Sequence, residues 1–244
     1  KKVKGDDGQS EILSLDLDTL EYTPQQKSKF PVLEQTKPID DVKKRFKVLI
    51  GGKDKAGEFY RKSLGGLFAY VSNRIPEISD ELYRIDEAMR AGFGWQHGPF
   101  EIWDAVGLEK GLELIEQSGH KAAGWVNEMK QAGVNSFYEV KEEILHYYSI
   151  PDEKMVEVPG IRNFIILDHI RPTKTVWSND ECSVEDLGDG ILNIEFRSKM
   201  NSLGSGVLSG INKGIELAEK DFRGVVIGNH GQNFSVGANL GMIF

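Results

Sequence analysis

A glycine-rich segment near residue 240 has residue types that could do chemistry. It reads Phe234-Ser235-Val236-Gly237-Ala238-Asn239-Leu240 and follows an apolar run typical of a buried strand. In such a turn the backbone N–H groups of Gly237 and Ala238 are bare, so they could donate to an oxygen that gains negative charge during a reaction. Most glycine-rich turns after a strand only reverse the chain, so the pattern alone leaves a structural role open.

Other reactive side chains are sparse. The single cysteine, Cys182, excludes a disulfide framework and fits the reducing cytosol, so we expect a cytoplasmic protein. The five histidines are far apart in sequence and predict no metal site. Gly204-x-Gly206 before a helix is similar to a dinucleotide loop, but Ser209 stands in place of the third glycine. We therefore expect no nucleotide site there.

The elements that must position the glycine-rich turn begin at residue 182. The pattern predicts a strand over 182–187, a turn at Gly188-Asp189-Gly190, and a second strand over 191–196. A helix over about 205–220 and a strand over 224–228 follow, and this order favours parallel strand pairing. The apolar face of that helix is expected to be Val207, Leu208, Ile211, Ile215 and Ala218.

Helical spacing of apolar residues governs residues 39–135. It predicts helices within 42–50 and 59–71, and a third helix capped by Ser79 and ended by Gly92, with Ile78, Leu82, Ile85 and Met89 on one face. A fourth helix begins at Gly98-Pro99. Two more are expected over 109–117 and 121–131. The aromatic residues expected to fill the core are Phe93, Trp95, Phe100 and Trp103.

The remaining stretches have weaker patterns. Residues 1–38 are polar and interrupted by proline, which predicts a tether with one strand-like run over 12–22. Residues 136–181 predict an irregular connector with short strands, and a helix over 140–147 is the alternative. The fold class is therefore α+β, in which a helical domain over 39–135 precedes a ββα segment over 182–244.

Composition narrows the possible partners. The chain is 39% hydrophobic and 28% charged, which is typical of a folded globular protein. Its net charge of −8 argues against nucleic acid as a partner. No apolar run is long enough to cross a bilayer. Because the chain starts at Lys1 and stops after an apolar run, we expect it to be part of a longer protein.

The stretch 85–107, IDEAMRAGFGWQHGPFEIWDAVG, resembles a known signature. The C-terminal helical domain of 3-hydroxyacyl-CoA dehydrogenases has a very similar run. In that family a preceding Rossmann domain holds NAD, and a His–Glu pair abstracts the hydroxyl proton; neither has a match here. Larger relatives have two copies of the helical domain, and the first contributes an Asn–Arg pair. Tyr60-Arg61 stands in its place, which implies the second, non-catalytic copy.

The segment from about Ser183 to Phe244 resembles the start of the enoyl-CoA hydratase (crotonase) family. The resemblance rests on Asn201-Ser202-Leu203, the counterpart of an N-A-L turn, and on the segment 234–240, in which Asn239 stands where Asp is usual. It implies that the N–H of Ala238, next to Gly237, is half of an oxyanion hole for a thioester. The residues implied to touch coenzyme A are Lys199, Met200, Ser202, Val236 and Asn239.

Together, the two resemblances imply the central part of a bifunctional fatty-acid β-oxidation enzyme. Such an enzyme hydrates 2-enoyl-CoA and oxidises 3-hydroxyacyl-CoA with NAD, and the hydratase glutamates and second oxyanion donor would lie beyond Phe244. Residues 1–244 alone are expected to be inactive. The alternatives are a non-catalytic assembly or acyl-CoA docking module, and a crotonase-type isomerase or hydrolase. We further expect a homo-oligomer, with a thiolase as a possible pathway partner.

Overall fold

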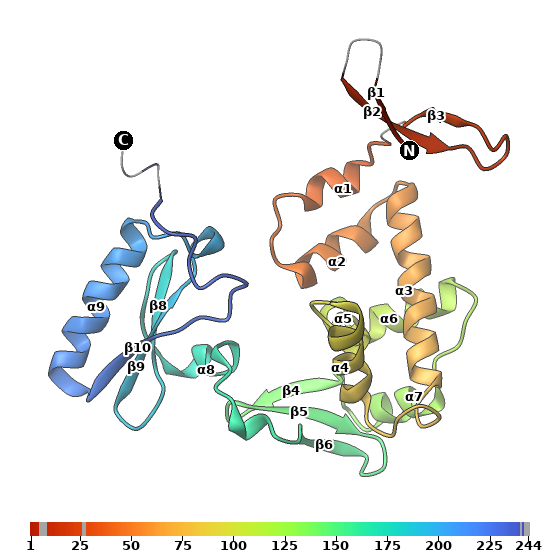
Figure 1. Cartoon of the computed structure of the whole chain (residues 1–244). Helices are drawn as coiled ribbons and strands as arrows, with labels where there is room; N and C mark the ends of the chain where they lie inside the picture. Colours follow the sequence, from red (N-terminus) through yellow and green to blue (C-terminus); the bar gives the residue numbers. More distant parts are fainter. Residues whose placement is uncertain (5–8, 26–27, 240, 242–244) are drawn as a thin grey trace. The chain divides into compact units, whose positions relative to one another are not determined.

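The computed structural model describes residues 1–4, 9–25, 28–239 and 241. It divides into two compact units, Lys1–Phe137 and Tyr138–Phe244 (Figure 1). Unit 1 is mainly helical, and unit 2 combines two β-sheets with helices. The mixed α and β composition of the chain is confirmed.

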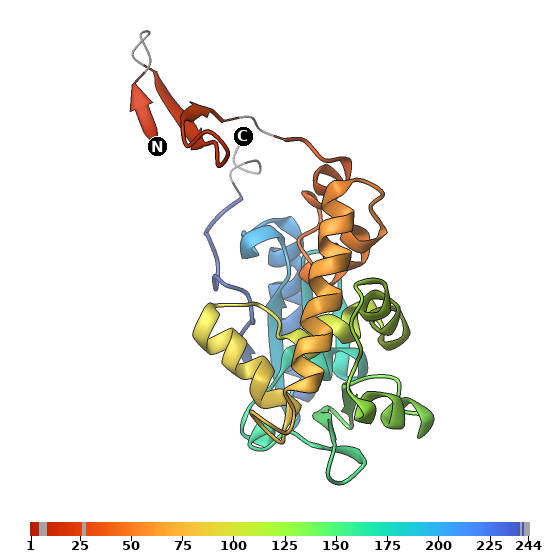
Figure 2. The same ribbon diagram turned by 90° about the vertical axis from the view of Figure 1, so that its right-hand side faces the viewer.

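Helices fill most of unit 1, and the long α3 runs through them in both views (Figures 1 and 2). Helix α3 packs closely on α6, because Gly65 of α3 has no side chain at the contact, where a Cβ would lie 2.3 Å from the Leu114 carbonyl oxygen of α6. Gly111 of α6 instead faces Trp103 of α5, whose indole nitrogen would lie 1.8 Å from an added Cβ. The described helices are α1 (Pro31–Thr36), α2 (Val42–Gly51), α3 (Lys55–Asn73), α4 (Leu82–Phe93), α5 (Pro99–Val106), α6 (Leu108–Gln117) and α7 (Gly124–Gln131). The predicted positions of α5, α6 and α7 are confirmed to within three residues.

Stacked aromatic side chains form the core of unit 1. Phe68 and Trp103 stack with ring centroids 4.9 Å apart, and Phe137 contacts both Trp103 and Phe100. Phe68, Phe100, Trp103 and Phe137 are fully buried. Because aromatic pairs bury large areas and prefer offset geometry, this cluster fixes how α3 and α5 meet.

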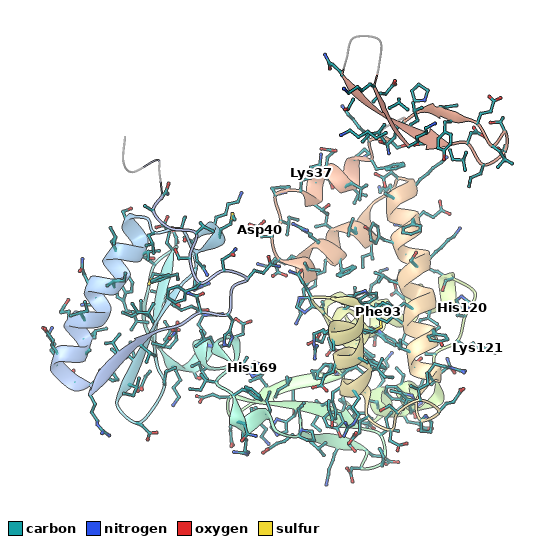
Figure 3. All side chains as sticks on the ribbon, in the orientation of Figure 1. Lys37, Asp40, Phe93, His120, Lys121 and His169 are labelled. Atoms are coloured by element: carbon teal, nitrogen blue, oxygen red, sulfur yellow. The ribbon has the colours of Figure 1, made fainter. Side chains whose placement is uncertain are left out.

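Two predictions for this unit were partly wrong. Phe93, labelled in Figure 3, is 76% exposed and Trp95 is 37% exposed, whereas Phe100 and Trp103 are buried as predicted. They differ because α5 faces the core directly, while Phe93 ends α4 and Trp95 lies in the following loop. Likewise, α4 ends at Gly94, whose φ of +67° supplies the left-handed turn, instead of at Gly92.

Ser79 does not cap α4. Its hydroxyl accepts from the N–H of Glu81, the residue before the helix, so it forms a local turn instead. Two of the residues expected on the buried face of α4, Ile85 and Met89, line a groove of about 520 Å³ between α3 and α4, and Ile78, expected with them, is 65% exposed. Leu82 alone of that set is fully buried.

The predicted tether has more structure than expected. Strands β1 (Lys2–Lys4), β2 (Ser10–Leu15) and β3 (Tyr22–Pro24) form an antiparallel sheet in the order β1-β2-β3. Helix α1 begins at Pro31, a favoured first helical residue, and Val32 is buried against Leu49 and Ala56. The prediction that proline interrupts regular structure in this segment is wrong at Pro31, which begins a helix.

Unit 2 starts with a small antiparallel sheet in the order β4-β5-β6. Its strands are β4 (Tyr138–Lys141), β5 (Ile144–Ser149) and β6 (Lys154–Glu157). The predicted short strands are confirmed, and the alternative helix over 140–147 is wrong. Between β4 and β5, Glu142 and Glu143 both have positive φ and form a tight turn that a helix could not contain.

The second sheet of unit 2 has the order β10-β9-β8-β7. Its strands are β7 (Thr175–Ser178), β8 (Cys182–Asp186), β9 (Ile191–Phe196) and β10 (Gly224–Ile227), and α9 (Ser205–Asp221) lies beside it (Figure 1). Strands β9 and β10 are parallel, as predicted. The connector expected over residues 136–181 is more regular than predicted, because it contains the helix α8 (Leu167–Lys174) besides the short strand β7.

Helix α9 packs on the sheet through a face that matches the prediction in part, because Val207, Ile211 and Ala218 contact the core as expected and Leu208 and Ile215 do not. Val207, Gly210 and Gly214 are buried, whereas Leu208 and Ile215 are almost half exposed. A Cβ on Gly210 would lie 2.2 Å from the Cys182 sulfur, so glycine allows the helix to approach β8. Burial raises the pKa of the Cys182 thiol to about 11, so this cysteine is an unreactive core residue.

Candidate functional site

The glycine-rich turn lies beside the loop that precedes α9. A parallel bridge joins Leu203 to Ala238: the Leu203 N–H donates to the Gly237 carbonyl at 2.8 Å, and the Asn239 N–H donates to the Leu203 carbonyl at 3.0 Å. Two segments about 35 residues apart in sequence are thereby held side by side. The turn residue Leu240 lies outside the described residues.

The bridge leaves the amide of Ala238 without an acceptor. In a parallel pairing, the residue at the centre of the bridge points its N–H away from the partner strand. Among the described residues, no atom accepts a hydrogen bond from the Ala238 N–H, and Ala238 is exposed. An exposed, fixed and unused amide is able to bind an oxygen of a ligand.

Gly237 supports this arrangement through its backbone. Its φ of +91° is a conformation that other residues rarely adopt, and its N–H donates to the Ser235 hydroxyl at 3.0 Å. A Cβ built on Gly237 would meet no atom within 4 Å. The glycine is therefore needed for the turn conformation. It is not needed to make room for a neighbouring atom.

The residues implied to touch coenzyme A lie on the same two segments. Lys199, Met200 and Ser202 are in or next to the short 3-10 helix η2 (Lys199–Asn201), and Val236 and Asn239 flank the Gly237-Ala238 pair. Met200 and Val236 are 60% and 50% exposed. The side chain of Asn239 accepts from the Gly241 N–H at 3.1 Å, and its backbone is used in the bridge. The apolar pair is thus open to a ligand.

Two asparagines near the turn, Asn201 and Asn229, were not predicted as site residues, although Asn201 belongs to the segment on which the crotonase resemblance rests. Asn201 is 7% exposed, and its side-chain amide donates to Asn229 Oδ1 and to the Asn233 carbonyl, both at 2.8 Å. Asn229 in turn donates to the Phe234 carbonyl at 3.2 Å. A sequence signal existed, since asparagine tolerates the positive φ that Asn201 adopts, but it does not reveal a partner 28 residues away.

The start of α9 is closed to phosphate groups. Glu181 Oε2 accepts the Gly206 N–H at 2.9 Å, and a Cβ on Gly206 would lie 2.6 Å from the same oxygen. A carboxylate already occupies the helix N-terminus and would repel an anion. The N-terminus of α9 therefore does not fit the phosphate groups of the NAD that a dehydrogenase would use.

A buried polar cluster covers the other face of β8 and β9. Arg171 of α8 forms two hydrogen bonds with Glu195, both 2.9 Å long, and Ser183 donates to the same carboxylate. Burial raises the pKa of Glu195 above its ordinary value, although Arg171 opposes the shift. Since the carboxylate is fully engaged by these donors, the cluster has a structural role.

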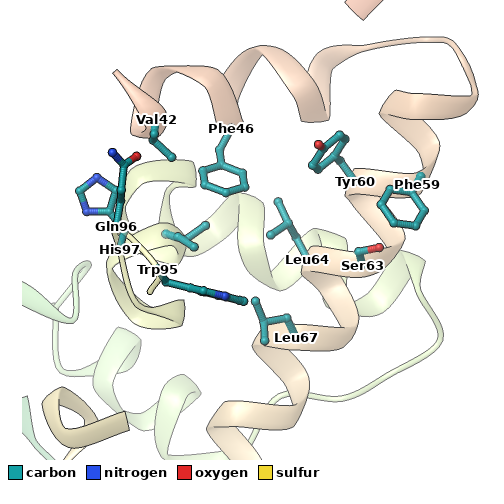
Figure 4. A pocket seen from close by; sticks show the side chains of 11 residues that line it. Val42, Phe46, Phe59, Tyr60, Ser63, Leu64, Leu67, Trp95, Gln96 and His97 are labelled. Carbon is teal, nitrogen blue, oxygen red and sulfur yellow. The ribbon is translucent and has the colours of Figure 1, made fainter. Parts of the chain in front are cut away.

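Unit 1 contains an apolar pocket of about 300 Å³. Its walls come from α2, from α3 and from the loop after α4, and Figure 4 shows Phe46, Leu64, Leu67 and Trp95 converging on it. His97 lies at its edge, and burial together with the nearby Lys43 lowers the pKa of its imidazole. The pocket therefore holds a neutral histidine at neutral pH beside apolar walls.

Tyr60 and Arg61 have separate positions. Tyr60 lines the apolar pocket, whereas Arg61 donates to the carbonyls of Ile50 and Gly52 at the end of α2. An arginine that satisfies helix C-terminal carbonyls is structural. The described part of the chain has no cluster of three or more potential metal ligands, and its helices include none long and apolar enough to cross a membrane.

Comparisons with known proteins support the dehydrogenase resemblance. Residues 72–142 match the family model "3-hydroxyacyl-CoA dehydrogenase, C-terminal domain". A Bacillus subtilis protein described as a probable 3-hydroxyacyl-CoA dehydrogenase is 40% identical over 95% of this chain and 29% of its own length. A Rickettsia prowazekii protein described as a putative fatty acid oxidation complex trifunctional enzyme is 24% identical over 80% of this chain and 24% of its own.

The chain spans less than a third of the length of these curated relatives. No solved structure gave a significant match. Residues 72–142 contain the whole 85–107 signature, including the α4–α5 corner. Residues 72–142, which contain α4 to α7, are thus similar to the C-terminal domain of 3-hydroxyacyl-CoA dehydrogenases, and the chain has relatives described as fatty acid oxidation enzymes.

Proposed function

We propose that this chain is part of a fatty-acid β-oxidation enzyme that hydrates 2-enoyl-CoA and oxidises the resulting 3-hydroxyacyl-CoA with NAD. The similarity of residues 72–142 to a dehydrogenase domain supports the oxidation. Support for the hydratase part comes from unit 2, where its strand–strand–helix order carries a bare backbone amide. We further propose that residues 1–244 alone perform neither reaction.

The observation that carries the hydratase proposal is the unused N–H of Ala238. Attack of water on a 2-enoyl thioester moves negative charge onto the thioester oxygen, and a fixed amide donor stabilises that charge. Ala238 is held by the Leu203 bridge, so its N–H needs no rearrangement to donate. In this proposal unit 2 orients and polarises the thioester, and the rest of the enzyme supplies the second donor and the proton-transfer groups.

The NAD-dependent step belongs to another part of the enzyme in this proposal. NAD supplies a hydride acceptor when it is bound, but the start of α9 is occupied by Glu181 and offers it no phosphate site. Unit 1 would have a structural role beside the dehydrogenase domain. The structural role of Arg61 at the end of α2 agrees with this. We also propose a cytoplasmic location, a homo-oligomer and, as a pathway partner, a thiolase.

Replacing Ala238 by proline in the full-length protein tests the hydratase proposal. Proline removes the N–H, so kcat for hydration of a 2-enoyl-CoA should fall by about 100-fold or more. Because proline also fixes φ at position 238 and restricts Gly237 before it, hydrogen exchange of the Leu203 and Asn239 amides must show that the bridge persists. The matched control is Ala238→Gly, which keeps the N–H and should retain activity within a few-fold. Equal activity of the proline variant and the wild type, with unchanged circular dichroism, would refute the role of this amide.

A second candidate function is an acyl-chain docking module, and the apolar pocket of unit 1 favours it. The pocket has the size of a small-molecule site and apolar walls, and the groups around His97 at its edge are of both signs, Lys43 as well as Glu101 and Asp41. The apolar walls suit an unbranched acyl chain. In that case unit 1 would hold the chain of a fatty acid or acyl-CoA without reacting with it.

Photolabelling distinguishes this function from the first. Dodecanoic acid with a photoreactive group near its methyl end should label peptides that contain Phe46, Ser63 or Trp95. Ser63→Trp fills the pocket from an exposed position and should abolish labelling, whereas Lys62→Trp, one residue along the helix and outside the pocket, should not. Labelling that is unchanged by Ser63→Trp would rule out the docking function.

A further inference from the structure

The two loops that meet at the Ala238 amide follow two neighbouring strands of the sheet. Residues 198–204 follow β9, and residues 228–239 follow β10. Parallel neighbours bring both loops to the same sheet edge, but the sheet hydrogen bonds end at Gly228. Beyond that point, the described contacts between the loops are the Leu203 bridge and the hydrogen bonds of Asn201.

Asn201 has a conformation that requires support. It is buried and has a φ of +54°, as does its neighbour Met200 with a φ of +56°. Two successive residues with positive φ are uncommon outside glycine-rich turns and persist where surrounding contacts hold them. Asn201 is held within its own loop by a hydrogen bond from its backbone N–H to the Ser198 carbonyl at 2.9 Å, and to the other loop by the two hydrogen bonds that its side-chain amide donates.

Asn229 completes a short relay. Its Oδ1 accepts from Asn201, and its Nδ2 donates to the carbonyl of Phe234, at the start of the glycine-rich turn. Only a side-chain amide has a donor and an acceptor at this separation, so aspartate or leucine of similar size could not replace it. The chain of contacts thus runs from the loop before α9, through Asn201 and Asn229, to Phe234, four residues before Ala238.

We propose that Asn201 and Asn229 are positioning residues that fix where the Ala238 N–H points. The proposal rests on the proposed hydratase function, and neither asparagine needs to touch the substrate. An oxyanion donor acts only within a narrow range of distance, and displacement by about 1 Å can cost about 100-fold in rate. Loss of the relay removes the hydrogen bonds that hold residues 229–234 and leaves only the packing of the Phe234 ring on Phe196 described for them, so the amide of Ala238 can shift.

The test uses Asn201→Gly and Asn229→Ala in the full-length protein. Glycine keeps the positive φ and removes the amide, so the backbone is not strained by the change. Each variant should lower kcat for 2-enoyl-CoA hydration by about 10- to 100-fold and change KM less than about 3-fold, because the donor acts in the transition state. The kcat of the double variant should be no lower than that of the less active single variant, since the two asparagines act as a unit.

A milder variant and a control protect against failure to fold. Asn229→Asp keeps the acceptor for Asn201 and loses only the donor to Phe234, so an intermediate loss of kcat is expected. Gln232→Ala, at an exposed position in the same loop, should leave kcat unchanged. Hydrogen exchange of the Leu203 and Asn239 amides, which form the bridge, should become faster in the asparagine variants and stay unchanged in the control.

The two proposals fail in different ways. If the wild-type enzyme hydrates no 2-enoyl-CoA, the proposed function is wrong, and the exchange rates still report whether the asparagines hold the loops. If the wild type is active and both asparagine variants keep its kcat, the positioning role is overturned. Faster exchange at the bridge with unchanged kcat would also overturn it, because the relay would then support the loops without affecting the amide.

Discussion

The α4–α5 corner of unit 1 and the Gly237-Ala238 turn of unit 2 are both glycine-rich, but they use their backbone N–H groups differently. At the corner, Asp86 accepts the N–H groups of Phe100 and Glu101 at 3.0 Å each, and Glu101 accepts that of Gly98 at 2.7 Å. At the turn, the bridge to Leu203 uses the N–H of Asn239 and leaves that of Ala238 unused.

The difference separates glycine that serves packing from glycine that serves a site. A Cβ on Gly98 would lie 2.2 Å from the Asp86 side chain, so the corner is closed around its glycine. Gly237 has open space around it and is needed for its φ alone. Satisfied donors stabilise the fold, whereas a donor left bare at an exposed, ordered turn is available to a ligand.

The largest effect is expected at the closed corner. Asp86→Ala removes a fully buried carboxylate that accepts two backbone N–H groups, so the free energy of unfolding of unit 1 should fall by about 3 kcal/mol or more. Chemical denaturation followed by tryptophan fluorescence measures this change. The same variant should leave hydration of 2-enoyl-CoA by the folded full-length protein unchanged.

Two further variants sharpen that prediction. Asp86→Asn keeps one acceptor oxygen and should lose roughly half as much stability. Asp80→Ala removes a nearby exposed carboxylate and should change the free energy of unfolding by less than about 0.5 kcal/mol. A variant at the α4–α5 corner that keeps wild-type stability but no longer hydrates 2-enoyl-CoA would show that the corner serves the reaction and not the fold.

Smaller changes in the free energy of unfolding are expected for two glycines of unit 1, and they have opposite signs. Gly111→Ala places a methyl group 1.8 Å from the Trp103 indole nitrogen and should destabilise unit 1 by about 2 kcal/mol. Gly92→Ala, in the exposed interior of α4 with no atom within 4 Å, should stabilise it by about 0.5–1 kcal/mol. Denaturation midpoints that move in the same direction for both variants would contradict the structure.

Regular patterns in the sequence predicted most of the elements. Period-3.6 spacing located α5, α6 and α7, and alternation located β8 and β9, because each of these has one buried face. The prediction failed where a nearby element changed the environment. Phe93 and Trp95 lie at and after the end of α4 and are exposed, although their residue types suit a core. No local signal in the sequence indicates which end of a helix is buried in the core.

The sequence indicated the backbone conformation of the candidate site but not the side-chain contacts that hold it in place. Glycine in a turn after a strand indicated the bare amide of Ala238, since the required φ is a local property. The relay through Asn201 and Asn229 joins loops 28 residues apart and depends on the parallel pairing of β9 and β10. Likewise, the occupation of the α9 N-terminus by Glu181 could not be predicted, because that residue precedes β8 and meets α9 only in the folded sheet.

The smallest effect is expected at Asp54, which caps α3 nearer to the solvent than Asp86. Hydrogen bonds from the Val32 and Gly57 N–H groups lower the pKa of Asp54, so its carboxylate stabilises the folded state above about pH 4. That stability is lost as the pH falls through the lowered pKa. Asp54→Ser keeps a capping oxygen without a titrating group. The difference in thermal midpoint between wild type and variant should therefore shrink below pH 4, and a difference that stays constant from pH 7 to pH 3 would show that the charge of Asp54 adds nothing to its cap.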